Sequence, residues 1–282
     1  MTQAPVRAPR RPAALAARVV RKERLTPHLV RLVLGGGDLA RFEPSPHADS
    51  YVKLAFCPPG ARPRTEDGRV DLAAVREALG PDAVRLRAYT VRAFDAAAAE
   101  LTLDVVVHGD EGLAGPWAAR AAGGEEALVV GPGGAWSPDP AHAAHLLVGD
   151  ASALPAVAVA LERLPADAVG HAVLEVPGPE DRLPLVAPAG VHVTWLGTGT
   201  GRPGRALVEA VRALPALPAP LGAFLHGEAE AVRELRRHLR QDRGVAREAL
   251  SASGYWRLGL DDEGWRAAKR GWVEAVEAED AA

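Results

Sequence analysis

Arg87-Ala88-Tyr89-Thr90-Val91-Arg92 is the most informative segment of this chain, together with Leu101–His108 and the loop Gly109–Trp117 that follow it. The first two segments predict strands, because they combine β-branched and aromatic residues and are bounded by Asp and Gly. Side chains alternate along a strand, so Tyr89 faces one way and Thr90 faces the other. The Gly-rich loop then opens a short Ala-rich helix.

This arrangement is typical of a site for a flat cofactor that carries phosphates. A tyrosine ring can stack on such a cofactor, a hydroxyl can hydrogen-bond to its polar edge, and an arginine can hold its phosphates. A Gly-rich helix start can cradle a pyrophosphate. For the hexapeptide alone, an ordinary hairpin with its polar residues in solvent is an equal alternative. The second segment weakens that alternative.

The first half of the chain predicts a small antiparallel β-barrel. Its candidate strands are short, rich in Val, Leu and Tyr, and bounded by Gly, Pro or Asp. They are Ala17–Lys22, Leu29–Leu34, Tyr51–Phe56, Arg87–Arg92, Leu101–His108 and Ala127–Val130. An insertion, Cys57–Arg85, holds a polar loop and a helix over Asp71–Leu79 that ends at Gly80-Pro81.

The second half predicts a parallel sheet with helices on its faces, because strands alternate with helices after Pro138-Asp139-Pro140. The strands are His145–Val148, Ala172–Val176, Val191–Leu196 and Ala223–His226, and the helices are Leu154–Leu164, Arg205–Leu214 and Glu230–Arg240. The acidic tail predicts a helix over Trp265–Glu277. We therefore divide the chain into a disordered leader (1–13), a barrel domain (14–137), an α/β domain (141–260) and a helical tail (261–282).

Composition limits the classes of function. The formal net charge of the 282-residue chain is −3, which gives no argument for a nucleic-acid partner. No apolar run reaches the ~18 residues that a membrane span needs, and no apolar core follows the basic N-terminus. The one cysteine, Cys57, allows no internal disulfide and fits a reducing compartment. His142 and His145 lack a second pair of ligands. We expect a cytoplasmic monomer with no resident metal and no membrane insertion.

Several motifs in this order resemble those of the siderophore-interacting proteins, ferric-siderophore reductases related to ferredoxin–NADP reductases. The R-x-Y-S/T-x-R pattern matches Arg87–Arg92, D-x-x-x-H-G-D-x-G matches Asp104–Gly112, and A-S-x-W matches Ala114–Trp117. Gly149–Ala156, His226–Glu228 and Ala252–Arg257 resemble the family's G-D-E-T/S-A-L-P-A, G-E and S-G-Y-W-R segments. The resemblance covers about residues 14 to 260.

Two positions depart from the family pattern. Gly115 stands where the family has a serine, which removes a hydroxyl ligand for phosphate but leaves the backbone N–H. Gly133, within Gly131-Pro132-Gly133-Gly134, stands where the family often has arginine. The second departure removes a basic residue expected near the iron chelate, so it bears on siderophore preference more than on flavin binding.

The resemblance implies an FAD-binding barrel, a nicotinamide-nucleotide domain and the reduction of Fe(III) held in a siderophore. It implies that Tyr89 stacks on the isoalloxazine and that Thr90, the residue assigned to catalysis, hydrogen-bonds near N5. The cofactor-binding residues would be Arg87, Tyr89, Thr90, Val91, Arg92, His108, Gly112, Ala114, Gly115, Trp117, Asp150, Ser152, Ala153 and Trp256. Lys53 and Arg257 would form a basic pocket for the chelate.

Two features of the second half concern the electron donor, NAD(P)H or a ferredoxin. The turn Gly149–Ser152 follows the first strand, where open α/β sheets bind ligands, although Ser152 is equally well explained as a helix N-cap. Gly199–Gly204 matches G-x-G-x-x-G, but it follows the third strand and contains Pro203, which favours a plain loop.

Alternatives to the chelate reductase remain open. One is a general NAD(P)H:flavin or redox-partner reductase on the same fold, and the other is a siderophore-binding module without turnover. The predicted helix Glu230–Arg240 carries several arginines, which are typical of a solvated helix face. The alternative is that they form a docking face for an anionic ligand or an acidic electron-donor protein.

Overall fold

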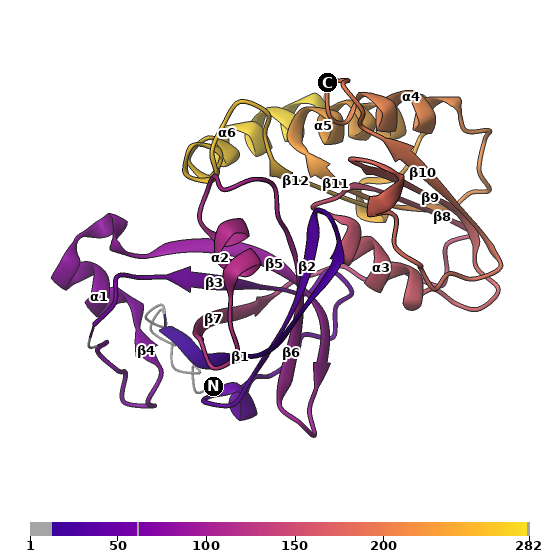
Figure 1. Cartoon of the computed structure of the whole chain (residues 1–282). Helices are drawn as coiled ribbons and strands as arrows, with labels where there is room; N and C mark the ends of the chain where they lie inside the picture. The colour runs from indigo at the N-terminus through magenta and orange to yellow at the C-terminus, as the bar shows by residue number, and fades with distance from the viewer. Residues whose placement is uncertain (1–12, 61, 281–282) are drawn as a thin grey trace, which may run out of the picture.

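The computed structural model describes residues 13–60 and 62–280, so nearly all of the predicted leader lies outside the described residues. Figure 1 shows two lobes, a barrel formed by the first half of the chain and an α/β layer formed by the second half. The prediction of a six-stranded antiparallel barrel followed by a parallel sheet is confirmed. We propose Pro138-Asp139-Pro140 as the boundary between the two domains.

The barrel strands are hydrogen-bonded in the order β2-β6-β5-β3-β7-β1, and a further pairing of β1 with β2 closes the ring. They are β1 (Ala13–Thr26), β2 (Leu29–Gly35), β3 (Tyr51–Phe56), β5 (Arg85–Asp95), β6 (Glu100–Val106) and β7 (Glu126–Gly133). The long strand β1 makes closure possible. Its first part pairs with β7 and its second part pairs with β2, and register shifts at Val19/Arg21 and Arg24/Thr26 mark irregularities along it.

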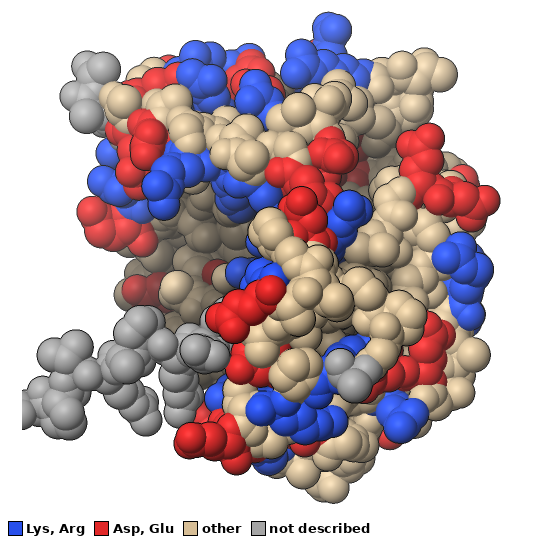
Figure 2. All heavy atoms as spheres, turned by 90° about the vertical axis from the view of Figure 1, so that its left-hand side faces the viewer, with Lys and Arg blue, Asp and Glu red and all other residues tan. Residues whose placement is uncertain are grey.

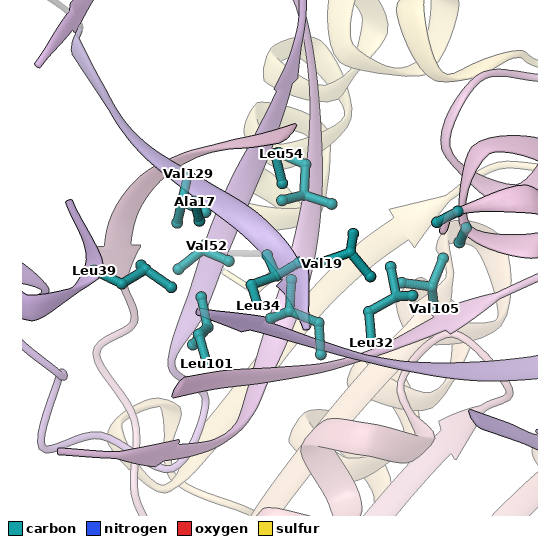
Figure 3. Packing of buried hydrophobic residues seen from close by; sticks show 14 of the residues in the cluster. Ala17, Val19, Leu32, Leu34, Leu39, Val52, Leu54, Leu101, Val105 and Val129 are labelled. Carbon is teal, nitrogen blue, oxygen red and sulfur yellow. The ribbon is translucent and has the colours of Figure 1, made fainter. Parts of the chain in front are cut away.

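Alternating apolar side chains fill the barrel. Leu101, Leu103 and Val105 lie at every second position of β6 and are fully buried. They meet Leu32 and Val52 from other strands in one cluster. Figure 3 shows Leu32, Val52, Leu101 and Val105 pointing into the interior of the ring. This alternation of buried side chains is why the sequence pattern predicted strands.

The insertion after β3 forms a small subdomain on the barrel. It contains β4 (Val70–Asp71), which pairs with the start of β1, and α1 (Leu72–Leu79). The side chain of Asp71 accepts hydrogen bonds from the amides of Ala73 and Ala74, both at 3.0 Å, and so caps α1. The helix predicted over Asp71–Leu79 is therefore observed as Leu72–Leu79, with Asp71 as its N-cap.

The second domain is a parallel sheet of order β10-β9-β8-β11-β12. Its elements are β8 (Ala144–Asp150), α3 (Leu154–Glu162), β9 (Val169–Val176), β10 (Gly190–Gly197), α4 (Arg205–Ala213), β11 (Leu221–Glu228), α5 (Ala229–Arg237), β12 (Leu250–Trp256) and α6 (Asp262–Asp280). The edge strand β12 was not predicted, because Ser-Ala-Ser-Gly is a poor strand-forming sequence. Pairing with β11 imposes its conformation.

The helices divide between the two faces of this sheet. Residues of α4, α5 and α6 share one apolar cluster with Leu146 and Leu225, whereas α3 shares another with Leu147 and Phe224. The α3 cluster also includes Leu29 of the barrel, so the two domains are joined by a continuous apolar contact. Within the described residues, no helix is long and apolar enough to span a membrane.

Candidate functional site

The motif strand β5 lies at the boundary between the two domains. The guanidinium of Arg87 donates to both carboxylate oxygens of Glu263, each at 2.8 Å, and lies 2.8 Å from Asp262. Arg92 donates to Glu162 of α3 at 2.9 Å. Both arginines that the family resemblance assigned to cofactor binding therefore bind carboxylates of the second domain, and a phosphate would have to share or displace these partners.

Tyr89 and Thr90 lie between those ion pairs. The ring of Tyr89 packs on the barrel core, and its burial raises the pKa of the phenol. Thr90 is buried on the opposite side of the strand, in register with Tyr51. The Val91 amide donates to the Ser50 carbonyl at 2.8 Å, and the Ser50 hydroxyl is buried and has no hydrogen-bond partner among the described residues. A half-buried ring beside an unpaired buried hydroxyl fits a flat ring with a polar edge.

The Gly-rich loop follows β6 and leads into α2 (Ala114–Arg120). Gly112 has a φ of 83°, a conformation that favours glycine. No side chain caps the first turn of α2, which leaves its first backbone N–H groups for another acceptor. His108 is exposed at the start of the loop, and Ala114 is buried. A Cβ at Gly115 would meet the Val106 carbonyl oxygen at 3.4 Å and Val107 Cα at 3.8 Å, both ordinary contacts, so the glycine is not required by space.

Asp104, the first residue of the motif Asp104–Gly112, has a structural role within the barrel. Arg31 of β2 donates to both of its oxygens, at 2.7 and 2.8 Å, and the carboxylate is buried. This hydrogen bond raises the pKa of Arg31. The pair ties β2 to β6 beneath the Gly-rich loop.

Two lysines from different domains interact electrostatically. Figure 2 shows a hollow between the two lobes, with Lys and Arg along its upper rim. Lys53 of β3 lies with its ammonium 6.0 Å from the centroid of the Tyr51 ring. Lys269 of α6 donates to Ser253 Oγ at 3.2 Å and to the Gly254 carbonyl at 2.8 Å. Burial and then the charge of Lys53 lower the pKa of Lys269. An anion between them would relieve this repulsion.

Sequence reasoning missed Lys269 and named Arg257 as the partner of Lys53. Arg257 instead pairs with Glu230 at the start of α5, at 2.9 Å. One signal was available in the sequence. Lys22, Lys53 and Lys269 are the only lysines in a chain that has 33 basic residues.

Tyr51 explains the absence of a side chain at Gly133. A Cβ at Gly133 would lie 2.5 Å from Cζ of Tyr51 and 2.7 Å from its hydroxyl oxygen. The ring therefore occupies the space that the family's usual arginine would enter. Tyr51 is 37% exposed and so adds an aromatic surface to the cleft beside Lys53.

The carboxyl edge of the parallel sheet is organised by buried Asp150. Its oxygens accept hydrogen bonds from the Ser152 amide (2.9 Å) and hydroxyl (2.5 Å), the Glu228 amide (2.8 Å) and the Trp256 indole (2.7 Å). Burial raises the pKa of this carboxyl, although all four donors oppose the shift. Ala153 is also fully buried, which leaves Ser152 and Trp256 as the half-exposed members of this predicted set.

The loop Gly199–Gly204 is closed by a carboxylate of its own domain. Glu175 accepts hydrogen bonds from the Thr198 hydroxyl at 3.0 Å and from the Gly204 amide, at the start of α4, at 2.9 Å. A negative group already lies where a phosphate would bind, which favours the plain-loop interpretation.

On α5, Arg233 pairs with Glu279 of α6. The acidic tail thus covers part of the arginine-rich face, and α6 packs on the body through Trp265 and Trp272, whose ring centroids lie 5.6 Å apart.

A closed antiparallel barrel joined to a five-stranded parallel sheet, with the motif strand at their boundary, defines the two-domain fold of the ferredoxin–NADP reductase class. Two family profiles match this chain, the siderophore-interacting FAD-binding domain over residues 18–136 and the siderophore-interacting protein over residues 142–259. The chain belongs to the siderophore-interacting protein family and carries its FAD-binding domain.

Similar proteins agree with this assignment. An uncharacterized protein of Mycobacterium tuberculosis is 45% identical over 92% of this chain and 96% of its own length. The ferric vibriobactin reductase ViuB of Vibrio cholerae is 34% identical over 87% of this chain and 90% of its own. The crystal structure of a siderophore utilization protein from T. fusca superposes with a TM-score of 0.77, at 33% identity, over 90% of this chain and 96% of that one.

Proposed function

We propose that this protein is an FAD-dependent reductase of ferric siderophores that receives its electrons from NAD(P)H. The observation that carries the proposal is the FAD-binding motif strand, which lies at the domain boundary beside strand β3 and its Lys53, while the charge of Lys53 lowers the pKa of Lys269 from the second domain. Bound FAD would accept a hydride and pass single electrons to chelated Fe(III). Hard oxygen ligands hold Fe(III) better than Fe(II), so reduction loosens the metal.

The residues of the chain bind and orient in this proposal. Tyr89 presents its ring to the isoalloxazine, and Thr90 and Ser50 offer hydroxyls to the polar edge of the flavin. The loop from Gly112 to Trp117 supplies backbone amides to the pyrophosphate. Arg87 contributes its charge while it remains tied to α6. Electron transfer itself requires none of these side chains to exchange a proton.

The substrate pocket consists of Lys53, Lys269 and the ring of Tyr51. Two ammonium groups favour a chelate with net negative charge, and an exposed ring favours one that carries aromatic groups. Ferric catecholates have both properties. Arg257 retains its charge near the carboxyl edge of the sheet but is held by Glu230.

The donor domain offers the carboxyl edge of its sheet to a nicotinamide nucleotide, with Ser152 as the accessible side chain. Asp150, Ala153 and Trp256 would shape this edge from below. A ferredoxin is the alternative donor.

Absorption spectroscopy tests the proposal. Purified protein reconstituted with FAD should show a flavin spectrum that bleaches with anaerobic NADPH and recovers when a ferric tricatecholate is added. Bleaching with a reduced ferredoxin but not with NADPH would transfer the donor role to that protein. Saturation of the rate with the chelate separates this function from a general flavin reductase, which would reduce artificial acceptors without it.

One observation favours a binding module without turnover. Both motif arginines already hold carboxylates, which would compete with the phosphates of FAD. A protein that stays colourless after FAD is added and the excess removed, yet binds the ferric chelate, would establish that module.

A further inference from the structure

The two ends of the boundary between the domains are built differently. Strand β5 runs along this boundary, with Arg87 at the end that meets α6 and Arg92 at the end that meets α3. The two arginines lie five positions apart, which corresponds to about 17 Å at ~3.4 Å per residue. Figure 1 shows α6 and α3 on opposite sides of the boundary, so the contacts at the two ends can be compared.

At the α3 end the domains meet through buried apolar side chains. Leu29 of the barrel is 4% exposed and belongs to the apolar cluster of α3, against which Leu25 and Val106 also pack. The chain itself crosses between the domains here. Trp136, in the segment that leads from β7 to β8, packs on Phe224 of β11 with the ring centroids 4.6 Å apart. The covalent connection therefore lies within an apolar contact.

Polar contacts at the α3 end involve the backbone. The buried carboxylate of Asp181, in the loop after β9, accepts from the His28 amide at 3.1 Å and lies 2.9 Å from Nδ1 of the same residue. Arg163, at the end of α3, donates to the Pro46 carbonyl at 2.5 Å. Backbone groups have less freedom than side chains, so these contacts fix the two domains locally. We call Leu29, Trp136 and the pair His28–Asp181 the hinge.

At the α6 end the domains meet through polar groups. Arg87 binds Asp262 and Glu263, and Arg266 of α6 donates to the Leu86 carbonyl at 2.7 Å. The apolar cluster that contains residues of α6 otherwise consists of second-domain residues. Within the described part of the chain, no apolar cluster joins α6 to the barrel. We call Arg87 with Asp262 and Glu263 the latch.

The latch is a weak attachment. The side chains of Asp262 and Glu263 are 36% and 44% exposed, and ion pairs as exposed as these contribute little and are screened by salt. Burial raises the pKa of the Asp262 carboxyl, and the charge of Glu263 raises it further, although Arg87 opposes the shift. Repulsion between Lys53 of β3 and Lys269 of α6 acts against the closed arrangement.

We propose that the two domains open about the hinge at the α3 end, and that the latch holds the hollow between them closed at the α6 end. Release of the latch widens the hollow seen in Figure 2, so the size of ligand that it admits depends on ionic strength. The proposed function places the chelate in this hollow. The opening itself is a property of the chain and requires neither flavin nor chelate.

Distances between spin labels, measured by double electron–electron resonance on the full-length chain, test the proposal. The background variant Cys57→Ser restricts labelling to cysteines that are introduced. One label pair, Asp82→Cys with Ala275→Cys, spans the latch end, and a second pair, Glu43→Cys with Asp167→Cys, spans the hinge end. All four introduced positions are exposed.

The double variant Asp262→Asn and Glu263→Gln removes the charges of the latch. At the latch end, the population with the longer distance should rise about two-fold to ten-fold, because exposed ion pairs are lost. The distance at the hinge end should not change. The control Glu274→Gln neutralises an exposed carboxylate on the same helix and should behave as the intact protein does.

Salt provides a second test with a sign of its own. In the intact protein, raising NaCl from about 0.05 M to about 1 M, where the Debye length is about 3 Å, should increase the longer population at the latch end. In the double variant, salt screens only the repulsion between Lys53 and Lys269, so the longer population should stay constant or fall.

Each outcome decides the proposal. Equal latch-end distances in the intact protein and the double variant, or an equal change in the Glu274→Gln control, would overturn the latch. Equal lengthening at both label pairs would overturn the hinge. These measurements use the chain without flavin, so a negative result leaves the proposed function intact. Failure to bind FAD or to reduce a chelate would overturn that function and leave the latch intact.

Discussion

The carboxyl edge of the parallel sheet and the boundary face of the barrel both carry charged side chains, but these side chains differ in how they are paired. At the sheet edge, Asp150, Glu175 and Glu228 are buried, and each accepts hydrogen bonds from backbone amides of its own domain. At the barrel face, Arg87 pairs across the boundary while Lys53 and Lys269 repel each other. Charges satisfied within one domain hold the fold, whereas charges left in conflict between domains indicate a place for a ligand.

Replacement of Asp150 tests the structural half of this comparison and should give the largest effect. Asp150→Ala leaves the Trp256 indole and the Glu228 amide without their acceptor, each at a cost of ~1–3 kcal/mol. We expect the free energy of unfolding in urea to fall by about 3 kcal/mol or more. The control Asp139→Ala removes an exposed carboxylate and should change it by less than about 1 kcal/mol. Equal effects of the two variants would show that the edge does not depend on Asp150.

Removal of either cleft lysine tests the functional half. Lys53→Met and Lys269→Met should each lower kcat/KM for an anionic ferric chelate about ten-fold, through KM, because a charge-assisted contact is lost. The third lysine supplies the control, since Lys22 is exposed and donates to the Ala119 carbonyl on the barrel surface. Lys22→Met should leave kcat/KM unchanged. For a cationic ferric chelate, loss of Lys53 or Lys269 should leave kcat/KM unchanged or raise it, because a repulsion is removed. An equal loss for both chelates would contradict the charge argument.

The repulsion between the lysines also predicts a pH dependence. The pKa of Lys269 lies below 10.5, the ordinary value for lysine, because burial and the charge of Lys53 lower it. The ammonium is present below this lowered pKa and is lost as pH rises through it. KM for the anionic chelate should therefore rise with pH before an exposed lysine would titrate. In the variant Lys269→Arg the side chain keeps its charge over this pH range, so the rise in KM should disappear. A KM that stays flat up to pH 10.5 in the intact protein would contradict the lowered pKa of Lys269.

The two glycines that depart from the family pattern give the smallest effects and differ in sign. Gly115→Ser places its Cβ in ordinary van der Waals contact with Val106 and Val107 and adds a hydroxyl near the Gly-rich loop, so it should tighten FAD binding two-fold to ten-fold, as expected for about one hydrogen bond. Gly133→Ser drives its Cβ into the ring of Tyr51 and should raise KM for the chelate several-fold without changing FAD affinity. Flavin titration and chelate kinetics on both variants check this. If Gly133→Ser leaves KM for the chelate unchanged, the Tyr51 ring moves aside freely and this prediction is contradicted.

The barrel and the alternation of strands and helices were predictable because they rest on local patterns. Apolar residues at every second position of β6 predict a strand buried on one side whatever its partners are. The Asp71 cap and the Gly80-Pro81 stop likewise mark α1 from neighbouring residues. The strand β12 escaped prediction, since its Ser, Ala and Gly residues adopt extended structure only because β11 offers them a hydrogen-bonding edge.

The candidate site divides in the same way. By itself the sequence determined the motif strand, the Gly-rich loop and the family, because short motifs in fixed order carry that information. Only the tertiary structure decided that Arg257 pairs with Glu230, that the charge of Lys53 acts on Lys269, that Arg87 is tied to α6, and that Tyr51 fills the space beside Gly133. The physical reason is distance along the chain. These contacts join residues that are far apart in sequence, and their energies depend on burial and charge that exist only after the two domains have packed together.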